Sequence, residues 1–213
     1  MPSVVINARG EQRVRSGHPW IYRADVVDVD AAGGDIVQVV GPRRRMVGHA
    51  LFSNRSQIPI RMLTLGDEPA DESLLRLRLQ RAIQFRESLQ LDATAYRLVH
   101  GEADLLPSLV VDRYAGYLVV QALSQGMDRL LPTITSLLQE LLSPAGILAR
   151  NDPKVRALEG LEQTIADLAG AIPDSVTVRE GPIEYQVDLR RGQKTGLFLD
   201  QRENREAAAR YAR

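Results

Sequence analysis

The sequence contains no cysteine among its 213 residues. This absence excludes disulfide bonds and thiolate metal ligands within the chain, and it also excludes a cysteine nucleophile. The sequence has no apolar run of about 18 residues, the length that a membrane-spanning helix needs. The first ten residues carry no apolar signal core. We therefore expect a cytoplasmic protein without a membrane partner.

Lysine is almost absent, because Lys154 and Lys194 are the only two lysines among 27 basic residues. The formal net charge is zero, which does not favour a uniformly basic nucleic-acid binder. The charge is uneven, however: residues 1–65 contain nine arginines and five acidic residues. Arginine suits bidentate contacts with phosphate and stacking on bases. A general bias toward arginine codons is the alternative explanation, and both stay open.

The spacing of apolar residues predicts a small mixed β-barrel over residues 1–68. The predicted strands are residues 4–6, 36–40, 46–52 and 58–65. Turn residues separate them at Gly33-Gly34, Gly41-Pro42 and Ser53-Asn54. Residues 11–16 are expected to form one short helix.

Residues 69–189 predict a compact α+β domain that follows a linker with a glycine and a proline. One helix is expected over residues 73–89 and a second over 127–142, each with apolar side chains at helical spacing. Pro132 is expected in the first turn of the second helix, where proline is tolerated. The arginines of the first helix are interpreted as a solvated face. The predicted strands are residues 96–99, 109–111, 117–123, 147–149 and 183–189.

Residues 190–213 begin with a turn and end in a predicted helix. Asp200, with Glu203 three residues later, is typical of a capping box. An amphipathic helix at the end of a chain has nothing after it to pack against, so we expect a domain that is not completed. The alternative is a terminal helix that docks back on the middle domain.

The string Gly192-Gln193-Lys194-Thr195-Gly196-Leu197-Phe198-Leu199-Asp200-Gln201-Arg202-Glu203-Asn204-Arg205 is the most specific in the sequence. Its polar residues are too dense for packing alone, and loops that carry such groups are often functional. A hairpin followed by a capped helix on a wet surface is the alternative interpretation.

This string resembles the signature that leads into the catalytic domain of the large-subunit ribosomal RNA cytosine-5 methyltransferases, and related guanine methyltransferases carry a similar one. Residues 17–22 (GHPWIY) resemble the opening motif of that family's PUA domain, a small RNA-binding barrel. Residues 96–114 and 150–156 resemble two further motifs, so the resemblance covers essentially the whole chain. The chain departs from the family at His100, where asparagine is common, and at Leu105 and Ser108, where glycine is common.

The resemblance implies an α+β chain with three parts. These are a PUA-like barrel (1–68), a central α+β domain with its linker helix (69–189) and the start (190–213) of a doubly wound domain that binds S-adenosylmethionine. The glycine-rich cofactor loop of that domain would follow Arg213, and no G-x-G-x-x-G occurs in the chain. The family's cytosine chemistry also needs a cysteine thiolate. We therefore expect no catalytic residue in this chain and no methyl transfer by it alone.

The implied partner is large-subunit ribosomal RNA, and the implied reaction of the complete enzyme is methylation of a cytosine C5. The alternative is a non-catalytic RNA-binding fragment or remnant. A homodimer is a further expectation. A hydrolase that uses Asp104 and Asp112 has little support, because aspartates between two strands are typical of turns.

Two sets of site residues follow from the resemblance and from charge. The residues expected to face the cofactor or the target base are Gln193, Lys194, Thr195, Phe198, Asp200, Gln201, Arg202 and Asn204. The residues expected to contact RNA are Arg13, Arg15, His18, Arg43, Arg44, Arg45 and Arg55. Trp20 is expected to plug the barrel core, and His49 to be structural. No cluster of His, Asp and Glu has the spacing of a metal site.

Overall fold

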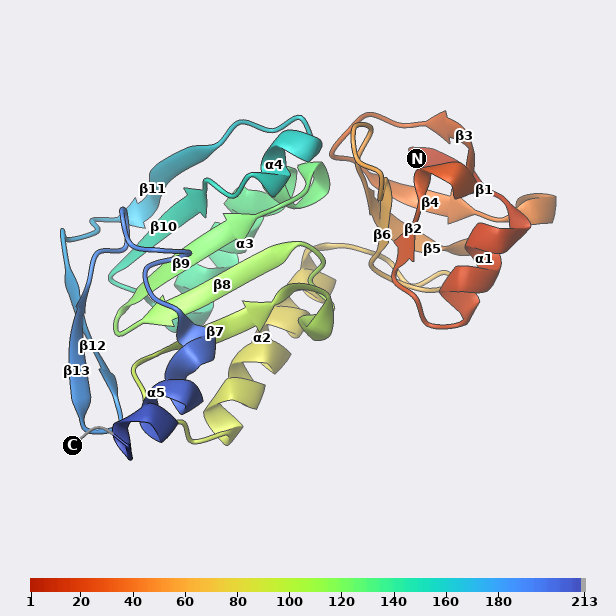
Figure 1. The fold of residues 1–213 in the computed structure, drawn as a ribbon. Helices are drawn as coiled ribbons and strands as arrows, with labels where there is room; N and C mark the ends of the chain where they lie inside the picture. Colours follow the sequence, from red (N-terminus) through yellow and green to blue (C-terminus); the bar gives the residue numbers. More distant parts are fainter. Residues whose placement is uncertain (212–213) are drawn as a thin grey trace.

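The computed structural model describes residues 1–211, and it places two sheet-based parts side by side (Figure 1). The first part contains β1 (Ser3–Ile6), α1 (Ala8–Arg15), β2 (Trp20–Ile21), β3 (Val26–Asp30), β4 (Ile36–Val40), β5 (Met46–Phe52) and β6 (Ile60–Met62). These strands form one curved sheet in the order β2-β6-β5-β4-β1-β3. Within this sheet, only β1 and β4 pair in parallel. The N-terminal part is thus the mixed β-structure that the sequence predicts.

Alternating burial explains why β4 could be predicted. Val37 and Val39 of β4 point into the core, whereas their neighbours are half-buried, as the two-residue period of a strand requires. The strand β3 was not predicted, because its apolar residues face outward: Val27 is 66% exposed. The helix α1 begins earlier than predicted, since the Asn7 side chain caps it by accepting a bond from the Gly10 amide at 2.9 Å.

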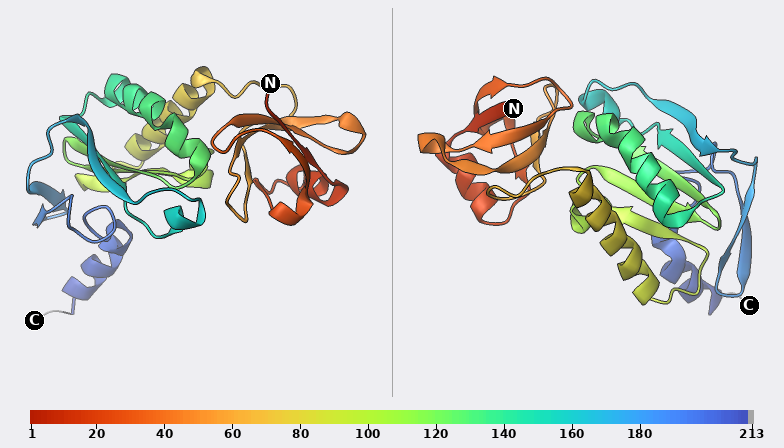
Figure 2. Two further views of the ribbon diagram at one scale, coloured as in Figure 1. Left: turned by 90° about the horizontal axis from the view of Figure 1, so that it is seen from above. Right: turned by 180° about the vertical axis from the view of Figure 1, so that it is seen from behind.

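The central part is a five-stranded sheet covered on one face by two helices. Its elements are α2 (Glu72–Ser88), β7 (Ala95–His100), β8 (Leu109–Tyr114), β9 (Tyr117–Ala122), α3 (Gln125–Leu142), β10 (Gly146–Asn151), α4 (Val155–Leu158) and β11 (Thr164–Gly170). The strand order is β11-β10-β9-β8-β7, so β7 and β11 form the edges. Figure 2 shows α2 and α3 next to each other on the same face. Leu79 and Ile134 from these helices lie in the buried cluster beneath them.

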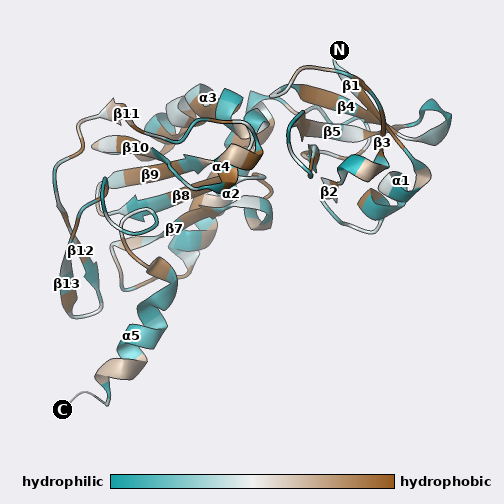
Figure 3. Cartoon of the chain, turned by 45° about the horizontal axis from the view of Figure 1, so that its top comes forward, coloured by the Kyte–Doolittle hydropathy of each residue, from teal (hydrophilic) through white to brown (hydrophobic). Residues whose placement is uncertain are grey.

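The C-terminal segment covers part of the opposite face of this sheet. A hairpin of β12 (Val176–Glu180) and β13 (Ile183–Val187) is followed by a loop and by α5 (Arg202–Ala209). Leu189 packs with Tyr114 of β8 in a separate buried cluster. Residues 190–211 contain no strand. Figure 3 shows α5 extending away from the sheet with a largely polar surface.

Two local predictions for the central part were wrong, and two strands were missed. α3 begins at Gln125, two residues earlier than predicted, with Ser124 as its cap, so Pro132 lies inside the helix rather than in its first turn. The strands β11 and β12 were not predicted. β11 carries no apolar alternation, because most of its side chains are exposed at this edge of the sheet.

The two parts share a buried junction, made of Leu51, Leu63, Arg61 and Glu159. Leu51 and Leu63 come from the barrel but belong to the hydrophobic cluster of the central part. Arg61 of β6 donates to the Glu159 carboxylate at 3.0 Å, and both side chains are at least 90% buried. Close packing extends to Gly126, where a Cβ would lie 2.7 Å from the Leu51 Cβ.

Trp20 also belongs to this boundary, and its expected role as a barrel plug was wrong. Its side chain is half-buried, and its Nε1 donates to Glu102 Oε1 of the central part at 2.9 Å. An indole N–H normally finds an acceptor when it is removed from water. The acceptor here lies 82 positions along the chain, so local sequence could not reveal it.

Candidate functional site

The Gln193–Arg205 segment is fastened to the sheet by a chain of hydrogen bonds. The Leu197 amide donates to Tyr114 Oη at 3.1 Å, and Tyr114 Oη lies 2.9 Å from Thr195 Oγ1. Thr195 Oγ1 donates to Asp112 Oδ2 at 2.6 Å. Because the Thr195 hydroxyl has one proton, it accepts from Tyr114. The series of hydrogen bonds therefore runs in one direction, from the Leu197 amide to the Asp112 carboxylate.

Burial and charge pairing explain why this series of hydrogen bonds is stable. Asp112 is fully buried, and it accepts from Arg97 Nε at 2.8 Å and from the second guanidinium nitrogen at 3.0 Å. The hydrogen bond to Asp112 raises the pKa of Arg97. Burial raises the pKa of Tyr114 to about 12, which keeps its hydroxyl protonated as a donor.

The two aspartates considered for hydrolysis both have structural roles. Asp112 holds Arg97 and Thr195, as described above. Asp104 accepts from both terminal nitrogens of Arg86 at 2.5 and 2.8 Å and from the His100 amide at 2.6 Å. Both carboxylates thus pair with an arginine and accept a further hydrogen bond within the chain, as the structural interpretation of these acids expects.

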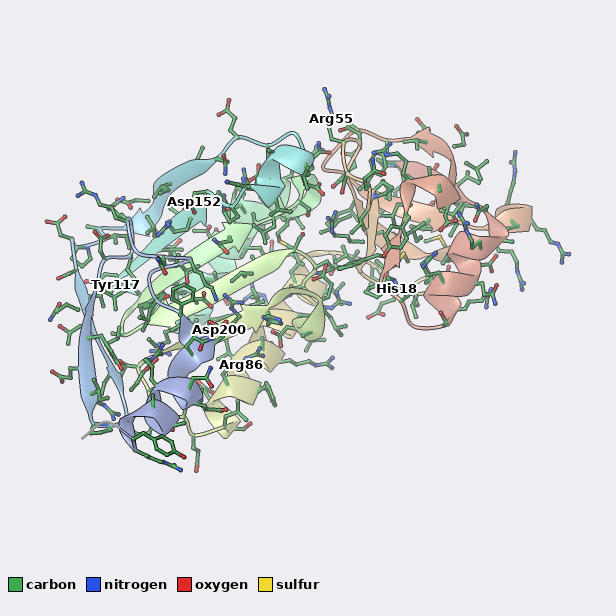
Figure 4. All side chains as sticks on the ribbon, in the orientation of Figure 1. His18, Arg55, Arg86, Tyr117, Asp152 and Asp200 are labelled. Atoms are coloured by element: carbon green, nitrogen blue, oxygen red, sulfur yellow. The ribbon has the colours of Figure 1, made fainter. Side chains whose placement is uncertain are left out.

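A cleft of about 350 Å³ lies at the β7 edge of the sheet, between the end of α2 and the C-terminal segment. Figure 4 labels Arg86 and Asp200, which approach it from these two sides. Its lining residues are Arg86, Leu89, Leu91, Tyr96, Arg97, His100, Lys194, Leu197, Leu199, Asp200 and Arg202. We refer to this feature as the β7 cleft.

Lys194 and Asp200 form an ion pair in the β7 cleft. Lys194 Nζ donates to the two Asp200 oxygens at 2.9 and 3.0 Å, and it lies 4.6 Å from the centre of the Phe198 ring. This hydrogen bond lowers the pKa of Asp200. Asp200 is therefore not the helix cap that its position predicts: α5 begins at Arg202, and no side chain caps it.

The structure divides the eight residues expected to face the cofactor or target base into three groups. Lys194, Asp200 and Arg202 line the β7 cleft. Thr195 is 1% exposed and anchors the segment from beneath. The remaining four are exposed outside the cleft lining: Gln193, Phe198, Gln201 and Asn204.

Sequence reasoning did not select Arg86, Arg97 or His100 as site residues, although they line the same cleft. Arg97 and His100 lie within the 96–114 motif, which was the only signal available for them. Arg86 lies on α2, and its arginine-rich surface was interpreted as solvated. Its side chain is instead about 10% exposed, because it pairs with Asp104.

The arginines at the tip of the barrel form an unpaired turn. Arg43, Arg44 and Arg45 are exposed between β4 and β5, at the end of the barrel away from the central part (Figure 1). Arg43 and Arg44 adopt left-handed backbone conformations, with φ of 64° and 56°. Within residues 1–211, none of the three makes a salt bridge or a side-chain hydrogen bond. We call this feature the arginine turn.

The other residues expected to contact RNA are engaged within the barrel or lie elsewhere. Arg15 pairs with Glu11 at 2.5 Å. Arg13 lies 3.6 Å from the buried Asp25 carboxylate and 4.8 Å from the centre of the Tyr22 ring. The seven residues therefore do not form a single patch.

His18 acts as a cap, because its Nδ1 accepts from the Trp20 amide at 3.1 Å. Arg55 is exposed near the central part, and a Cβ at Gly160 would lie 3.1 Å from its Cγ. Figure 4 labels both residues on the side of the barrel that faces the central part. The expected structural role of His49 is confirmed, since the side chain is buried and its Nδ1 lies 2.8 Å from the Glu68 carbonyl oxygen.

Comparison with known proteins supports the N-terminal assignment. Residues 4–65 match the model of the PUA-like domain, which confirms the predicted PUA-like N-terminus. The chain is 36% identical over 215 residues to Ribosomal RNA large subunit methyltransferase I of Pseudoalteromonas atlantica, covering 99% of this chain and 54% of that protein. It is 38% identical over 218 residues to the protein of the same name from Tolumonas auensis, covering 99% and 55%. The chain is homologous to these proteins. It spans about half the length of the curated relatives it matches.

Solved structures show the same fold. A putative SAM-dependent methyltransferase from Streptococcus mutans matches with a TM-score of 0.80 and 19% identity, over 97% of this chain and 54% of the other. A putative methyltransferase in complex with SAH matches with a TM-score of 0.81 and 19% identity, over 96% and 52%. Among residues 1–211, no helix is long and apolar enough to cross a membrane.

Proposed function

We propose that this chain is the RNA-binding portion of an S-adenosylmethionine-dependent methyltransferase that modifies large-subunit ribosomal RNA. The observation that carries the proposal is homology over 99% of the chain to proteins named for that activity. The PUA-like match over residues 4–65 and the unpaired arginine turn support an RNA-binding role for the barrel.

The arginine turn is proposed to contact the RNA backbone. Its three guanidinium groups are exposed and have no acidic partner within the described chain, so no protein contact must break before they bind phosphate. Arginine presents planar, bidentate donors that match phosphate oxygens. Contacts of this kind give affinity without reading the base sequence.

The C-terminal segment is proposed to face the cofactor or the target base. Gln193, Gln201 and Asn204 offer exposed amides, and Phe198 offers an aromatic ring that is 38% exposed. Amides and a ring suit the polar and flat groups of a nucleoside-containing ligand. When bound, S-adenosylmethionine supplies the transferable methyl group. Gln193, Phe198, Gln201 and Asn204, the exposed members of this segment, would hold one side of the cofactor.

The RNA-binding part of the proposal is tested with a large-subunit ribosomal RNA fragment at two salt concentrations. We expect a micromolar or weaker dissociation constant that increases steeply with salt. Replacing Arg43, Arg44 and Arg45 together by glutamine should reduce the slope of log affinity against log salt by roughly 0.7 to 0.9 for each lost contact. Arg81→Gln, an exposed arginine on α2, is the matched control. An affinity that does not change with salt would contradict the proposal.

The finer proposal is that the complete enzyme methylates C5 of a cytosine, and that these 213 residues alone transfer no methyl group. Nucleoside mass spectrometry of large-subunit ribosomal RNA, with and without the gene, should show the loss of one 5-methylcytidine. Loss of a methylguanosine instead would indicate that the complete enzyme methylates guanine, like the related guanine methyltransferases. An unchanged nucleoside profile would favour the alternative, a non-catalytic RNA-binding protein. Turnover of labelled cofactor by the chain itself would overturn the expected inactivity.

A further inference from the structure

The β7 cleft contains a positive charge that no acidic residue neutralises. Three carboxylates lie in or directly behind the cleft, and each has its own cation: Asp200 pairs with Lys194, Asp104 with Arg86 and Asp112 with Arg97. Arg202 also lines the cleft. Among the described residues it has neither a salt bridge nor a side-chain hydrogen bond. A guanidinium that is half-buried without a partner favours an anionic ligand.

Two further donors lie in the same cleft. Arg97 uses its Nε and one terminal nitrogen on Asp112, and its other terminal nitrogen lies 3.3 Å from His100 Nδ1. Arginine can only donate, so Nδ1 of the neutral imidazole accepts and Nε2 carries the proton. His100 is exposed, which makes this N–H available to a ligand.

The rest of the cleft wall is apolar and includes one aromatic ring. Leu89, Leu91, Leu197 and Leu199 line it together with Tyr96. Cationic donors next to apolar and aromatic walls are typical of sites that follow a nucleic-acid strand, in which phosphates and bases alternate. The volume of about 350 Å³ lies at the lower end of the range of small-ligand pockets.

We propose that the β7 cleft binds a phosphodiester group of an RNA strand through Arg202, the His100 Nε2–H and the outer nitrogen of Arg97. This inference rests on the proposed function, and it adds a second RNA contact far along the chain from the arginine turn. Arg202, which the sequence assigned to the cofactor side, then contacts the substrate strand. Lys194 and Asp200 remain paired and shape the wall of the cleft.

The first experiment uses the imidazole resonances of the full chain, which has three histidines. His100→Gln assigns the His100 signal. Titration with inorganic phosphate and, separately, with a single-stranded octauridylate should shift the His100 signal saturably and leave that of the buried His49 unchanged. Arg202→Gln should weaken both titrations about tenfold, the size expected for one charge-assisted hydrogen bond. Arg81→Gln should not change them.

The two ligands distinguish the sources of the phosphate. Tighter binding of octauridylate than of inorganic phosphate supports a site for a strand. Equal affinity would reduce the cleft to a site for free phosphate and overturn the proposal. A His100 shift with S-adenosylhomocysteine alone would assign the cleft to the cofactor and overturn it as well. Equal affinities of the wild type and Arg202→Gln for these ligands would also overturn the proposal.

A second measurement separates this inference from the proposed function. In RNA-binding assays across salt concentrations, Arg202→Gln should lower the slope for single-stranded RNA by about 0.7, the value for one lost phosphate contact. If the slope of log affinity against log salt falls in the arginine-turn variant but not in Arg202→Gln, the barrel still binds RNA and only the cleft proposal fails. If the wild type shows no salt-dependent RNA binding, the proposed function itself fails.

Discussion

Replacing Thr195 by valine tests whether the hydrogen-bond chain beneath the C-terminal segment determines how firmly that segment is held. Valine has nearly the shape of threonine but no hydroxyl. The Asp112 carboxylate loses a bond of 2.6 Å, and Tyr114 Oη loses its acceptor at 2.9 Å. A hydrogen bond to a charged group contributes about 1.5 to 3 kcal/mol, and a buried donor left without a partner costs about 1 to 3 kcal/mol.

The segment keeps other attachments, which limits the expected effect. Arg150 still donates to the Leu189 carbonyl at 2.7 Å and to the Gly192 carbonyl at 3.2 Å. We therefore expect the free energy of local opening to fall by about 3 kcal/mol, near the lower end of the combined range. Since about 1.4 kcal/mol corresponds to a factor of ten, amide exchange in the segment should become about 100-fold faster.

Hydrogen exchange at the Leu197 amide is the direct assay, because this amide donates to Tyr114 Oη. Thr195→Ser keeps the hydroxyl and should retain most of the protection, which makes it the matched control. If Thr195→Val exchanges like the wild type, the hydrogen-bond chain does not hold the segment. If Thr195→Ser, which keeps the hydroxyl, accelerates exchange as much as Thr195→Val, the hydroxyl does not determine how firmly the segment is held.

The remaining predictions concern the junction, one tyrosine and one glycine. Glu159→Ala leaves the buried Arg61 guanidinium without an ionic partner and should lower the free energy of unfolding by about 3 to 5 kcal/mol in chemical denaturation. Arg61→Met combined with Glu159→Leu should lower it much less; equal losses would contradict a role for charge burial. The raised pKa of Tyr114 contributes folding stability that is fully present below about pH 10 and is lost as the pH rises through about 12. The free energy of unfolding should fall by about 1.4 kcal/mol per pH unit in this window, because only the tyrosine of the unfolded state ionises there. Absorbance titration should show one tyrosine ionising late, and Tyr114→Phe should remove that step; a late step that persists would refute the assignment. Gly48→Ala would place a Cβ 2.0 Å from the Thr64 carbonyl oxygen and should cost at least about 1 to 3 kcal/mol in thermal unfolding; a wild-type melting temperature would contradict this backbone packing.

Several elements could be predicted from the sequence because their apolar residues face a core. β4, β5, α2 and α3 have this pattern, and each lies within a few residues of its predicted range. β3 and β11 could not be predicted, because they are edge strands with exposed side chains and therefore carry no pattern to read. The predicted cap at Asp200 failed for a different reason: a nearby lysine competes for the carboxylate.

The candidate site was only partly predictable for similar reasons. Its most specific string was recognisable, but the directions of its side chains were not. Lys194 is exposed and Thr195 is 1% exposed, although they are adjacent, because Lys194 adopts a left-handed backbone conformation with φ of 56° that turns the loop. The tertiary pairs that define the cleft, such as Arg86 with Asp104, join separate elements, so no local pattern predicts them.

The buried junction has a consequence for how RNA length would control affinity. Because the Arg61–Glu159 ion pair joins the barrel to the central part, the two proposed RNA contacts, at the arginine turn and in the β7 cleft, would act on one strand as linked sites. Once a strand has bound at one site, its other end meets the second site at a high effective concentration, provided that it is long enough to reach. Affinity should therefore rise in a step at one strand length, and variants that loosen the junction should flatten that step.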